Sequence, residues 1–431
     1  MSHVHIIGGG LAGLSAAIEL AAQARVTVYE AGPACGGRAR SFHDRSLDAR
    51  IDNGNHLILS SNDLTFRYLD IIGSRHTLTG PGLPIFPYYD LEDSLAWTLR
   101  LSKGKLPFWA LPGGRRVPGM KLSELASLGR FLRAGDRTTV ESCLSSGQLS
   151  RRLLIPFAIS VLNTDIHTGS AKLLGNVIRK SLAKGGMACC PWFPAVGLSE
   201  TLIDPAVAYL KRFHGDVRTG VRVSAIEQQN GRATALETGE GRIELGPEDQ
   251  VILAVPGPVA QSLLPGLTAP DAFESIANAH FRLPEKVQAR GVVAQAGFVG
   301  LVGGISEWIF LKGDILSVTV SAANRYADRS NSELLATIWS EIRRALDPVL
   351  SQPLPVAIPP SRLVWEKRAT FAATPEQNLL RPGARTDLVN LALAGDWTET
   401  GLPSTIEGSI QSGLQAVSAL GFRSAVENTG S

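Results

Sequence analysis

The chain contains few residues of the kinds that form disulfides or bind structural metals. Only four cysteines occur among 431 residues, at Cys35, Cys143, Cys189 and Cys190, without a C-x-x-C pair. This spacing disfavours disulfides and structural zinc, and it suits a reducing cytoplasm. No run of about eighteen apolar residues is present, so we expect no membrane-spanning segment. Because an apolar run begins at Val4, we also expect no secretory signal peptide.

The chain also carries little net charge. Charged residues make up 19% of the sequence and apolar residues 44%, and the formal net charge is +3. This composition is typical of a globular protein. A nucleic-acid partner is not indicated, because binding to phosphates would require a strong basic excess. The length of 431 residues allows two domains.

A G-x-G-x-x-G pattern stands between two apolar runs at the start of the chain. It follows residues 4–7 and precedes a helical stretch at 14–22, and a second run at 25–29 ends in an acid. The glycines permit a tight turn, close approach of a pyrophosphate to the helix N-terminus, and close packing of helix on strand. The acid would accept hydrogen bonds from adenosine ribose hydroxyls. The residues of this predicted dinucleotide site are Gly8, Gly10, Leu11, Ala12, Gly13 and Glu30.

A second pair of glycines follows soon after the acid. Gly36 and Gly37 would let the backbone pass under a ligand, and Arg38 or Arg40 could reach a phosphate. With these residues the chain resembles the flavin-dependent amine oxidase and carotenoid desaturase superfamily. In that superfamily the second glycine pair and its arginine contact the FAD pyrophosphate and ribityl chain. The resemblance therefore implies FAD, which the first glycine pattern alone does not distinguish from NAD.

Later parts of the chain carry the rest of the expected flavin site. Val223 lies in an alternating, strand-like run, and a matching valine in the superfamily contacts the adenine through its backbone. A buried-strand pattern ends at Gly395 and Asp396, where the carboxylate suits a ribityl hydroxyl. A helix that opens near Thr405 and Ile406 would direct its positive end at reduced flavin. Since this C-terminal segment has no cysteine or histidine that could tether the flavin, we expect FAD to be bound noncovalently. No metal site is predicted.

The predicted fold is α/β, with a Rossmann-like FAD-binding domain that is discontinuous in sequence. An α+β substrate-binding domain is inserted into it, as in amine oxidases and phytoene desaturases. We expect the FAD-binding domain at 1–75, 195–265 and 380–425, the substrate-binding domain at 76–194 and 266–379, and a C-terminal tail at 426–431.

The stretch from Arg100 to Arg133 is basic and partly apolar. It has eight basic residues and one acid, and Phe108 and Trp109 lie within an apolar run at 106–112. Such a segment suits docking on an anionic membrane surface, where an apolar substrate would be found. We therefore expect a cytoplasmic protein in peripheral contact with the inner face of the membrane. The alternative is a solvated helix face beside a core segment.

Several further segments narrow the resemblance. In this order they resemble the squalene-associated FAD-dependent desaturase group of hopanoid-producing bacteria, whose members act as hydroxysqualene dehydroxylases. The resemblance covers essentially the whole chain. It implies reduction of hydroxysqualene to squalene, in which an allylic carbon–oxygen bond breaks and flavin N5 delivers hydride. The segments are DNGNH at 52–56, LNT at 162–164, FPAVGLSE at 193–200, WIF at 308–310, WEKRATF at 365–371 and GLPSTIEG at 401–408.

His56 is the preferred candidate for the general acid or for a contact with the substrate hydroxyl. It lies in a segment that runs close to the flavin in the family, and histidine titrates near neutrality. We expect Asn53 and Gly54 beside the flavin. Asn55, a further catalytic candidate, stands where we expect glutamine in the family, and its shorter side chain puts that contact in doubt. Asp165 is the second choice for the acid, with a helix cap as its alternative role.

Two other functions are compatible with these motifs. An oxidative member of the superfamily, an amine oxidase or a carotenoid desaturase, would take hydride from its substrate. Trp397 could supply half of the aromatic pair that frames the flavin in amine oxidases, but no second ring is evident. The chain could instead be a non-catalytic flavoprotein subunit. No second nucleotide-binding glycine pattern is visible, so the sequence does not indicate direct use of NADPH. The electron donor could be a separate reductase or free reduced flavin.

Overall fold

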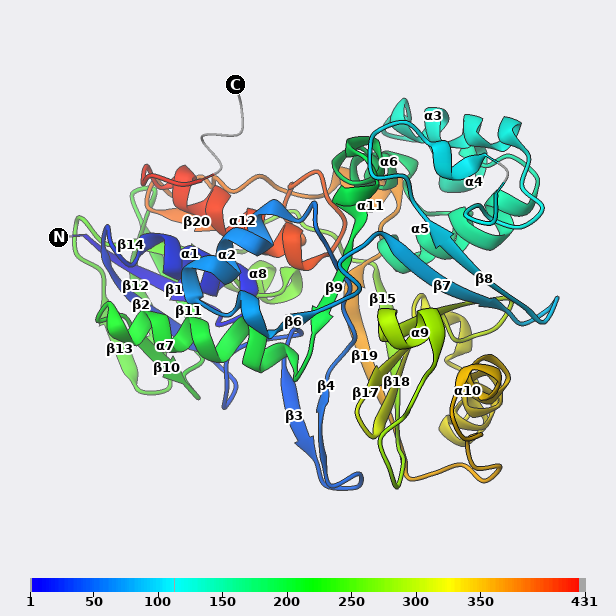
Figure 1. Ribbon diagram of the computed structural model, residues 1–431. Coiled ribbons are helices and arrows are strands. Elements are labelled where there is room, and N and C mark those ends of the chain that lie inside the picture. The colour runs from blue at the N-terminus through cyan, green and yellow to red at the C-terminus, as the bar shows by residue number, and fades with distance from the viewer. Residues whose placement is uncertain (1, 112, 426–431) are drawn as a thin grey trace.

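In the computed structural model, which describes residues 2–111 and 113–425, a five-stranded parallel sheet lies at the end of the molecule that holds the N-terminus (Figure 1). Its strand order is β10-β2-β1-β14-β20. These strands come from three distant parts of the chain, each within a segment expected for the FAD-binding domain. The boundaries of that domain stay a prediction. The strands are β1 (His3–Ile7), β2 (Arg25–Glu30), β10 (Asp216–Thr219), β14 (Gln250–Leu253) and β20 (Leu391–Leu393).

Within the described ranges, five helices belong to the same part of the molecule as the parallel sheet, and the first and last of them, α1 and α12, are in close contact. A Cβ on Gly413 of the last helix, α12, would lie 2.3 Å from the Ala12 carbonyl oxygen of α1. Because a real Cβ does not approach a carbonyl so closely, this contact requires glycine. It places the C-terminal helix beside the first one. The helices are α1 (Leu11–Leu20), α2 (Asp63–Ile72), α7 (Asp204–Arg212), α8 (Gly257–Leu263) and α12 (Ile406–Ala419).

A seven-stranded sheet forms the second large layer, with the order β19-β15-β18-β17-β16-β7-β8. β16 and β7 are parallel, and the other neighbours are antiparallel. Phe281 and Val318 of this sheet share a buried cluster with Ile338 and Trp339 of α10 (Asn331–Leu346). The strands are β7 (Ile85–Asp90), β8 (Leu95–Arg100), β15 (Phe273–Arg282), β16 (Phe298–Val302), β17 (Trp308–Lys312), β18 (Ile315–Val320) and β19 (Ser361–Phe371), and α9 (Gly291–Ala296) precedes β16.

A group of helices lies beyond β7 and β8, at the upper right of Figure 1. Its first helix lies at the end of the basic, partly apolar stretch from Arg100 to Arg133. Pro156 lies where a π-helical turn (Ser150–Leu154) runs into α5, a place that accommodates a residue without a backbone N–H, and Ser170 caps α6 by accepting from Leu173 N. The helices are α3 (Ala126–Leu132), α4 (Val140–Cys143), α5 (Ile155–Leu162) and α6 (Ala171–Lys180), with α11 (Pro375–Leu379) further along the chain.

Smaller sheets connect these parts. β11 to β13 form an antiparallel sheet, β3 and β4 form a hairpin, and β9 pairs with both β5 and β6. Their bounds are β3 (Ser41–Asp44), β4 (Ala49–Asp52), β5 (Ile58–Leu59), β6 (Leu78–Thr79), β9 (Pro191–Pro194), β11 (Val223–Gln229), β12 (Arg232–Thr238) and β13 (Gly241–Glu244).

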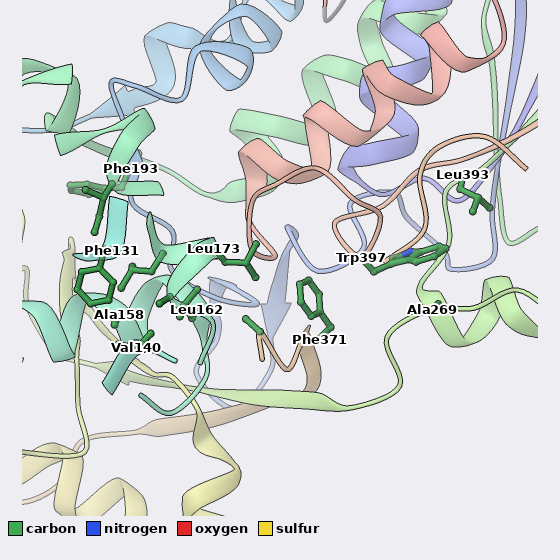
Figure 2. Close-up of a cluster of buried hydrophobic side chains, with 14 of the residues drawn as sticks. Phe131, Val140, Ala158, Leu162, Leu173, Phe193, Ala269, Phe371, Leu393 and Trp397 are labelled. Carbon is green, nitrogen blue, oxygen red and sulfur yellow. The ribbon is translucent and has the colours of Figure 1, made fainter. Parts of the chain in front are cut away.

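One hydrophobic core runs between the helical group and the nucleotide-binding end. Figure 2 shows Phe131, Leu162 and Leu173 of the helical group together, with Phe371 of β19 drawn between them and Trp397. All five side chains are buried in the same cluster. The helical group and the nucleotide-binding end therefore pack against one continuous core, which fixes their relative positions.

None of the helices in the described ranges combines the length and apolar character needed to cross a bilayer. The predicted tail at 426–431 lies outside the described residues.

Candidate active site

The first glycine turn joins β1 to α1. A Cβ on Gly8, whose φ is +111°, would lie 2.4 Å from the Ala254 carbonyl oxygen, and one on Gly13 would meet the Gly8 carbonyl. Beside Gly10, in contrast, no described atom lies within 4 Å of a Cβ position. Gly10 is the N-cap of α1, and no side chain caps this helix. Open space at an uncapped helix N-terminus suits a pyrophosphate.

The first residues of α1 offer donors to this space. Leu11, Ala12 and Gly13 open the helix, and backbone N–H groups in a first turn have no partner within the helix. Glu30 is fixed beside the turn, because its two carboxylate oxygens accept from Gly9 N at 2.8 Å and Gly32 N at 2.7 Å. Each oxygen keeps a lone pair for a further donor. The structure therefore brings the six residues of the predicted dinucleotide site together.

The second glycine pair lies against the first turn. Gly36 N donates to the Gly9 carbonyl at 2.8 Å, and a Cβ on Gly37 would lie 3.6 Å from the Gly10 Cα. Gly36 and Gly37 have φ values of +117° and +55°, a region that favours glycine. Two turns without side chains thus face the same space.

The two predicted arginines have different surroundings. Arg38 pairs with Asp396, with 2.6 Å between Nη2 and Oδ1, and also donates to the Ala369 carbonyl. This ion pair joins motifs 358 residues apart. Arg40 is exposed and donates to the Gly37 carbonyl. Arg38 is therefore the arginine that links the N-terminal and C-terminal parts of the site.

The C-terminal motif places the start of α12 at a cavity. Gly395 N donates to Ser412 Oγ at 2.9 Å, which ties the end of β20 to this helix. Thr405 is the N-cap, and its Oγ1 accepts from Gly408 N at 3.0 Å. Thr405 and Ile406 both line the cavity. The positive end of α12 therefore lies at the cavity, as a flavin ring that gains negative charge would require.

Val223 lies near the acidic end of the nucleotide site. It begins β11 and is buried, and two residues earlier Val221 N donates to the Glu30 carbonyl at 2.9 Å. The backbone at 221–223 therefore runs beside Glu30, where the adenosine is expected.

Asn53 and Gly54 are held between the two large layers. Asn53 Nδ2 donates to the Arg38 carbonyl at 3.2 Å and to a Glu366 oxygen at 3.1 Å. Asn278 Nδ2 donates to the Asn53 carbonyl at 3.0 Å, and a Cβ on Gly54 would lie 3.4 Å from that nitrogen. These contacts place the segment beside the Arg38–Asp396 pair.

Asn55 and His56 both line the cavity. Asn55 Nδ2 donates to Ser317 Oγ at 2.8 Å and to Thr319 Oγ1 at 3.1 Å, while its buried Oδ1 has no partner among the described residues. Burial lowers the pKa of His56 to about 4, although the Asp52 carboxylate opposes this shift. The imidazole is therefore neutral at pH 7. It can donate one hydrogen bond, but it does not carry the imidazolium proton that the predicted acid role requires.

Asp165 is not brought to this cavity. Its carboxylate accepts from His167 N at 3.0 Å in the turn after α5, and its side chain is 38% exposed. Asn163, two residues earlier, lines the cavity instead, where its Nδ2 donates to Thr370 Oγ1 at 3.0 Å and its Oδ1 accepts from Ala322 N. The geometry therefore gives Asp165 the local turn role and offers no support for catalysis.

The cavity itself has a volume of about 330 Å³ and lies between the helical group, the seven-stranded sheet and the start of α12. Most of its lining side chains are apolar. Because Asn55, His56, Thr405 and Ile406 belong to this lining, the cavity adjoins the expected flavin ring. Its aromatic lining residues are Phe86, Tyr88, Trp109, Phe157, Trp308 and Phe310.

Two tryptophans named in the sequence analysis are buried. Trp109 is only 3% exposed and lines the cavity, so it belongs to the core, whereas the adjacent Phe108 is 62% exposed. Trp397 is buried and donates to the Val255 carbonyl at 2.9 Å. Trp397 is not among the described residues that line the cavity.

A buried carboxyl group beside the cavity was not predicted from the sequence. Glu307 lies just before β17, its side chain is 11% exposed, and burial raises its pKa to about 7. One of its oxygens accepts from Ser321 N at 3.2 Å. A single glutamate before an apolar strand gives no sequence signal, since the same pattern is typical of an exposed turn.

Comparisons with known proteins agree with this geometry. The model of the family described as flavin containing amine oxidoreductase matches residues 11–420. Two relatives named hydroxysqualene dehydroxylase, from Sinorhizobium fredii and Rhodopseudomonas palustris, are each 42% identical over 416 residues, covering 96% of this chain and 97% of theirs. The solved cyclohexylamine oxidase of Brevibacterium oxydans has a TM-score of 0.69 at 16% identity, over 97% of this chain and 98% of that one.

The likeness to the solved oxidase confirms the predicted fold class. The residues present also fit FAD: the space beside Gly10 is open, two glycine turns face it, and Arg38 pairs with Asp396, whose neighbour Gly395 is tied to the last helix. FAD is therefore the cofactor of this site, and the chain belongs to the flavin containing amine oxidoreductase family.

Proposed function

We propose that this protein reductively removes the hydroxyl group of hydroxysqualene to give squalene. The observation that carries the proposal is the apolar, aromatic cavity that adjoins the flavin site. The relatives of that name are 42% identical across nearly the whole chain, which supports the same substrate. No described feature favours an amine oxidase or a silent subunit over this reaction.

The cofactor would be held by residues from both ends of the chain. Bound FAD in its reduced form supplies the hydride that the substrate carbon accepts. The two glycine turns and Arg38 would bind the pyrophosphate, Glu30 the ribose, Val223 the adenine and Asp396 the ribityl chain. Asn53 and Gly54 would lie beside the ring system, and the start of α12 would stabilise its negative charge.

The cavity residues would bind the hydrocarbon chain and exclude water. Burial of apolar surface contributes about 25 cal/mol per Å², so a thirty-carbon substrate supplies most of its own binding free energy. Dryness also matters, because water would capture the allylic cation that forms when the carbon–oxygen bond breaks. The ring of Trp308 can stabilise positive charge in the cavity. His56, as a neutral imidazole, would donate a hydrogen bond to the substrate hydroxyl.

Access to such a substrate would involve a membrane surface. We define the docking loop as Leu106, Phe108 and Leu111, whose side chains are 63%, 62% and 47% exposed. Basic residues lie close in sequence at 103, 105, 115 and 116. Trp109 of the same segment lines the cavity, so docking would bring the cavity close to the lipid. This supports a peripheral position on the cytoplasmic face of a membrane.

The decisive experiment is anaerobic incubation of the purified yellow protein with hydroxysqualene and chemically reduced FAD, followed by mass spectrometry of the lipid. We expect squalene in proportion to enzyme, and none with oxidised flavin alone. If no squalene forms, and amines or carotenoid precursors instead bleach the oxidised flavin, the protein is an oxidative member of the family. If squalene does form, the physiological electron donor can be identified by replacing the chemically reduced FAD in this assay with a reductase or with free reduced flavin.

A further inference from the structure

Glu307 lies behind two hydroxyl groups of the cavity wall. Its backbone N donates to the Thr319 carbonyl at 3.1 Å, which fixes the start of β17 against β18. Ser321, directly after β18, donates its N–H to the carboxyl at 3.2 Å, and its hydroxyl also hydrogen-bonds to it. Ser321 lines the cavity, whereas Glu307 does not belong to the described lining.

Ser160 of α5 lies near the same carboxyl. Its Oγ accepts from Trp308 Nε1 at 2.9 Å, so its own O–H is left to turn toward Glu307, and the Ser160 hydroxyl lowers the pKa of that carboxyl. Ser160 also lines the cavity. Two serine hydroxyls from different elements therefore connect one buried carboxyl to the substrate space.

We propose that Glu307 is the proton source for the departing hydroxyl group of the substrate, and that it acts through the hydroxyl of Ser160 or Ser321. This role rests on the proposed function. His56 cannot serve in the same way, because its imidazole is already neutral at pH 7. A carboxyl group with a pKa raised by burial to about 7 still holds its proton in a large fraction of molecules there.

Proton transfer and loss of water are coupled in this step. The serine hydroxyl gives its proton to the substrate oxygen and takes one from Glu307, while the carbon–oxygen bond breaks and water leaves. Bound reduced FAD would supply the hydride that the allylic carbon accepts, which would reduce the substrate and oxidise the flavin. Glu307 is left as a carboxylate close to the cation, which its charge stabilises. Solvent later returns the proton.

Few charged groups face Glu307 from the surrounding elements. A guanidinium nitrogen of Arg325 lies 4.0 Å from one of its oxygens, and Tyr326 follows Arg325. Arg325 lowers the pKa of the carboxyl, but burial has the larger effect. The neighbours from α5 and from the residue that follows β18 are the serine hydroxyls of Ser160 and Ser321. The carboxyl therefore titrates mainly in response to burial.

Glu307→Gln tests this role while preserving the shape of the side chain. In the variant we expect normal flavin absorbance and a turnover at least tenfold lower. The protonated form is the active one, so the wild-type rate falls as pH rises through about 7, and this limb disappears in the variant. The matched control is Glu274→Gln, another carboxyl whose pKa burial raises but without a described hydrogen bond to the cavity serines. The Glu274→Gln variant should keep both the wild-type turnover and the fall in rate as pH rises through about 7.

A second measurement does not depend on substrate. Infrared titration of the holoenzyme should show a protonated carboxyl band with a midpoint near 7 in the wild type and the Glu274→Gln variant. The band should be absent from the Glu307→Gln variant. Ser160→Ala and Ser321→Ala together should keep the band and lose turnover.

The outcomes separate the two proposals. If the wild type makes squalene and the Glu307→Gln variant matches its rate and pH profile, Glu307 is not the proton source and the proposed function stands. The same conclusion follows if no carboxyl band titrates near 7. If the wild type makes no squalene, the proposed function fails and this role falls with it.

Discussion

The crossing of α1 and α12 at Gly413 gives a stability prediction that can be worked from distances. An alanine Cβ at this position would lie 2.2 Å from Ser15 Oγ, 2.3 Å from the Ala12 carbonyl and 3.1 Å from Ala16 N. Ordinary contact requires about 3.4 Å, so the helices would have to separate by about 1 Å. Overpacking of this kind costs about 1–3 kcal/mol in the free energy of unfolding. The same shift would move the start of α12 away from the flavin.

The matched control is Gly129→Ala in α3. There a Cβ would have Arg133 at 3.7 Å as its nearest described neighbour, and alanine is the better helix former by about 0.5–1 kcal/mol. Urea unfolding, followed by circular dichroism and flavin fluorescence, should therefore show Gly413→Ala less stable and Gly129→Ala more stable than the wild type. Gly413→Ala should also bind FAD more weakly. A Gly413→Ala protein with wild-type stability and FAD affinity would refute the proposed close contact.

Three further predictions concern the cofactor, the cavity and the membrane. Arg38→Met should weaken FAD binding by about tenfold or more, whereas Arg40→Met should change it little, and equal effects in a fluorescence titration would contradict the distinction. His56→Ala should keep its flavin but lose roughly tenfold in turnover, with no change in the pH–rate profile near 6.5, because the ring is neutral down to about pH 4. Unaltered turnover would remove His56 from the reaction. Serine at all three positions of the docking loop should reduce sedimentation with anionic liposomes, while Val356→Ser, at another exposed apolar residue, should not. Equal sedimentation of both variants would exclude this loop as the contact.

The nucleotide-binding turns could be predicted because their signals are local. Gly8, Gly10 and Gly13 have fixed spacing, and the conformations that they permit follow from the lack of a side chain. The meeting of Arg38 with Asp396 could be expected only through the family resemblance, since no local pattern relates residues so far apart.

The cavity residues could not be read from sequence in the same way. Phe108 and Trp109 are adjacent and equally apolar, yet only Trp109 is buried, because a short turn directs it toward the core. Histidine usually titrates near neutrality, but the pKa of His56 depends on burial by distant segments. Glu307 was missed for the same reason: its neighbours Ser160 and Ser321 come from elsewhere in the chain.

The contact between Arg38 and Asp396 also bears on how the protein is made. During synthesis the glycine turns emerge first, while Asp396 and α12 emerge nearly last. The glycine turns with β1, α1 and β2 alone lack the ion pair with Asp396, the edge strand β20 and the helix α12 that packs on α1. Tight capture of FAD therefore requires almost the whole chain. Chains truncated before β20 would lack this half of the cofactor site and should be recovered without bound flavin.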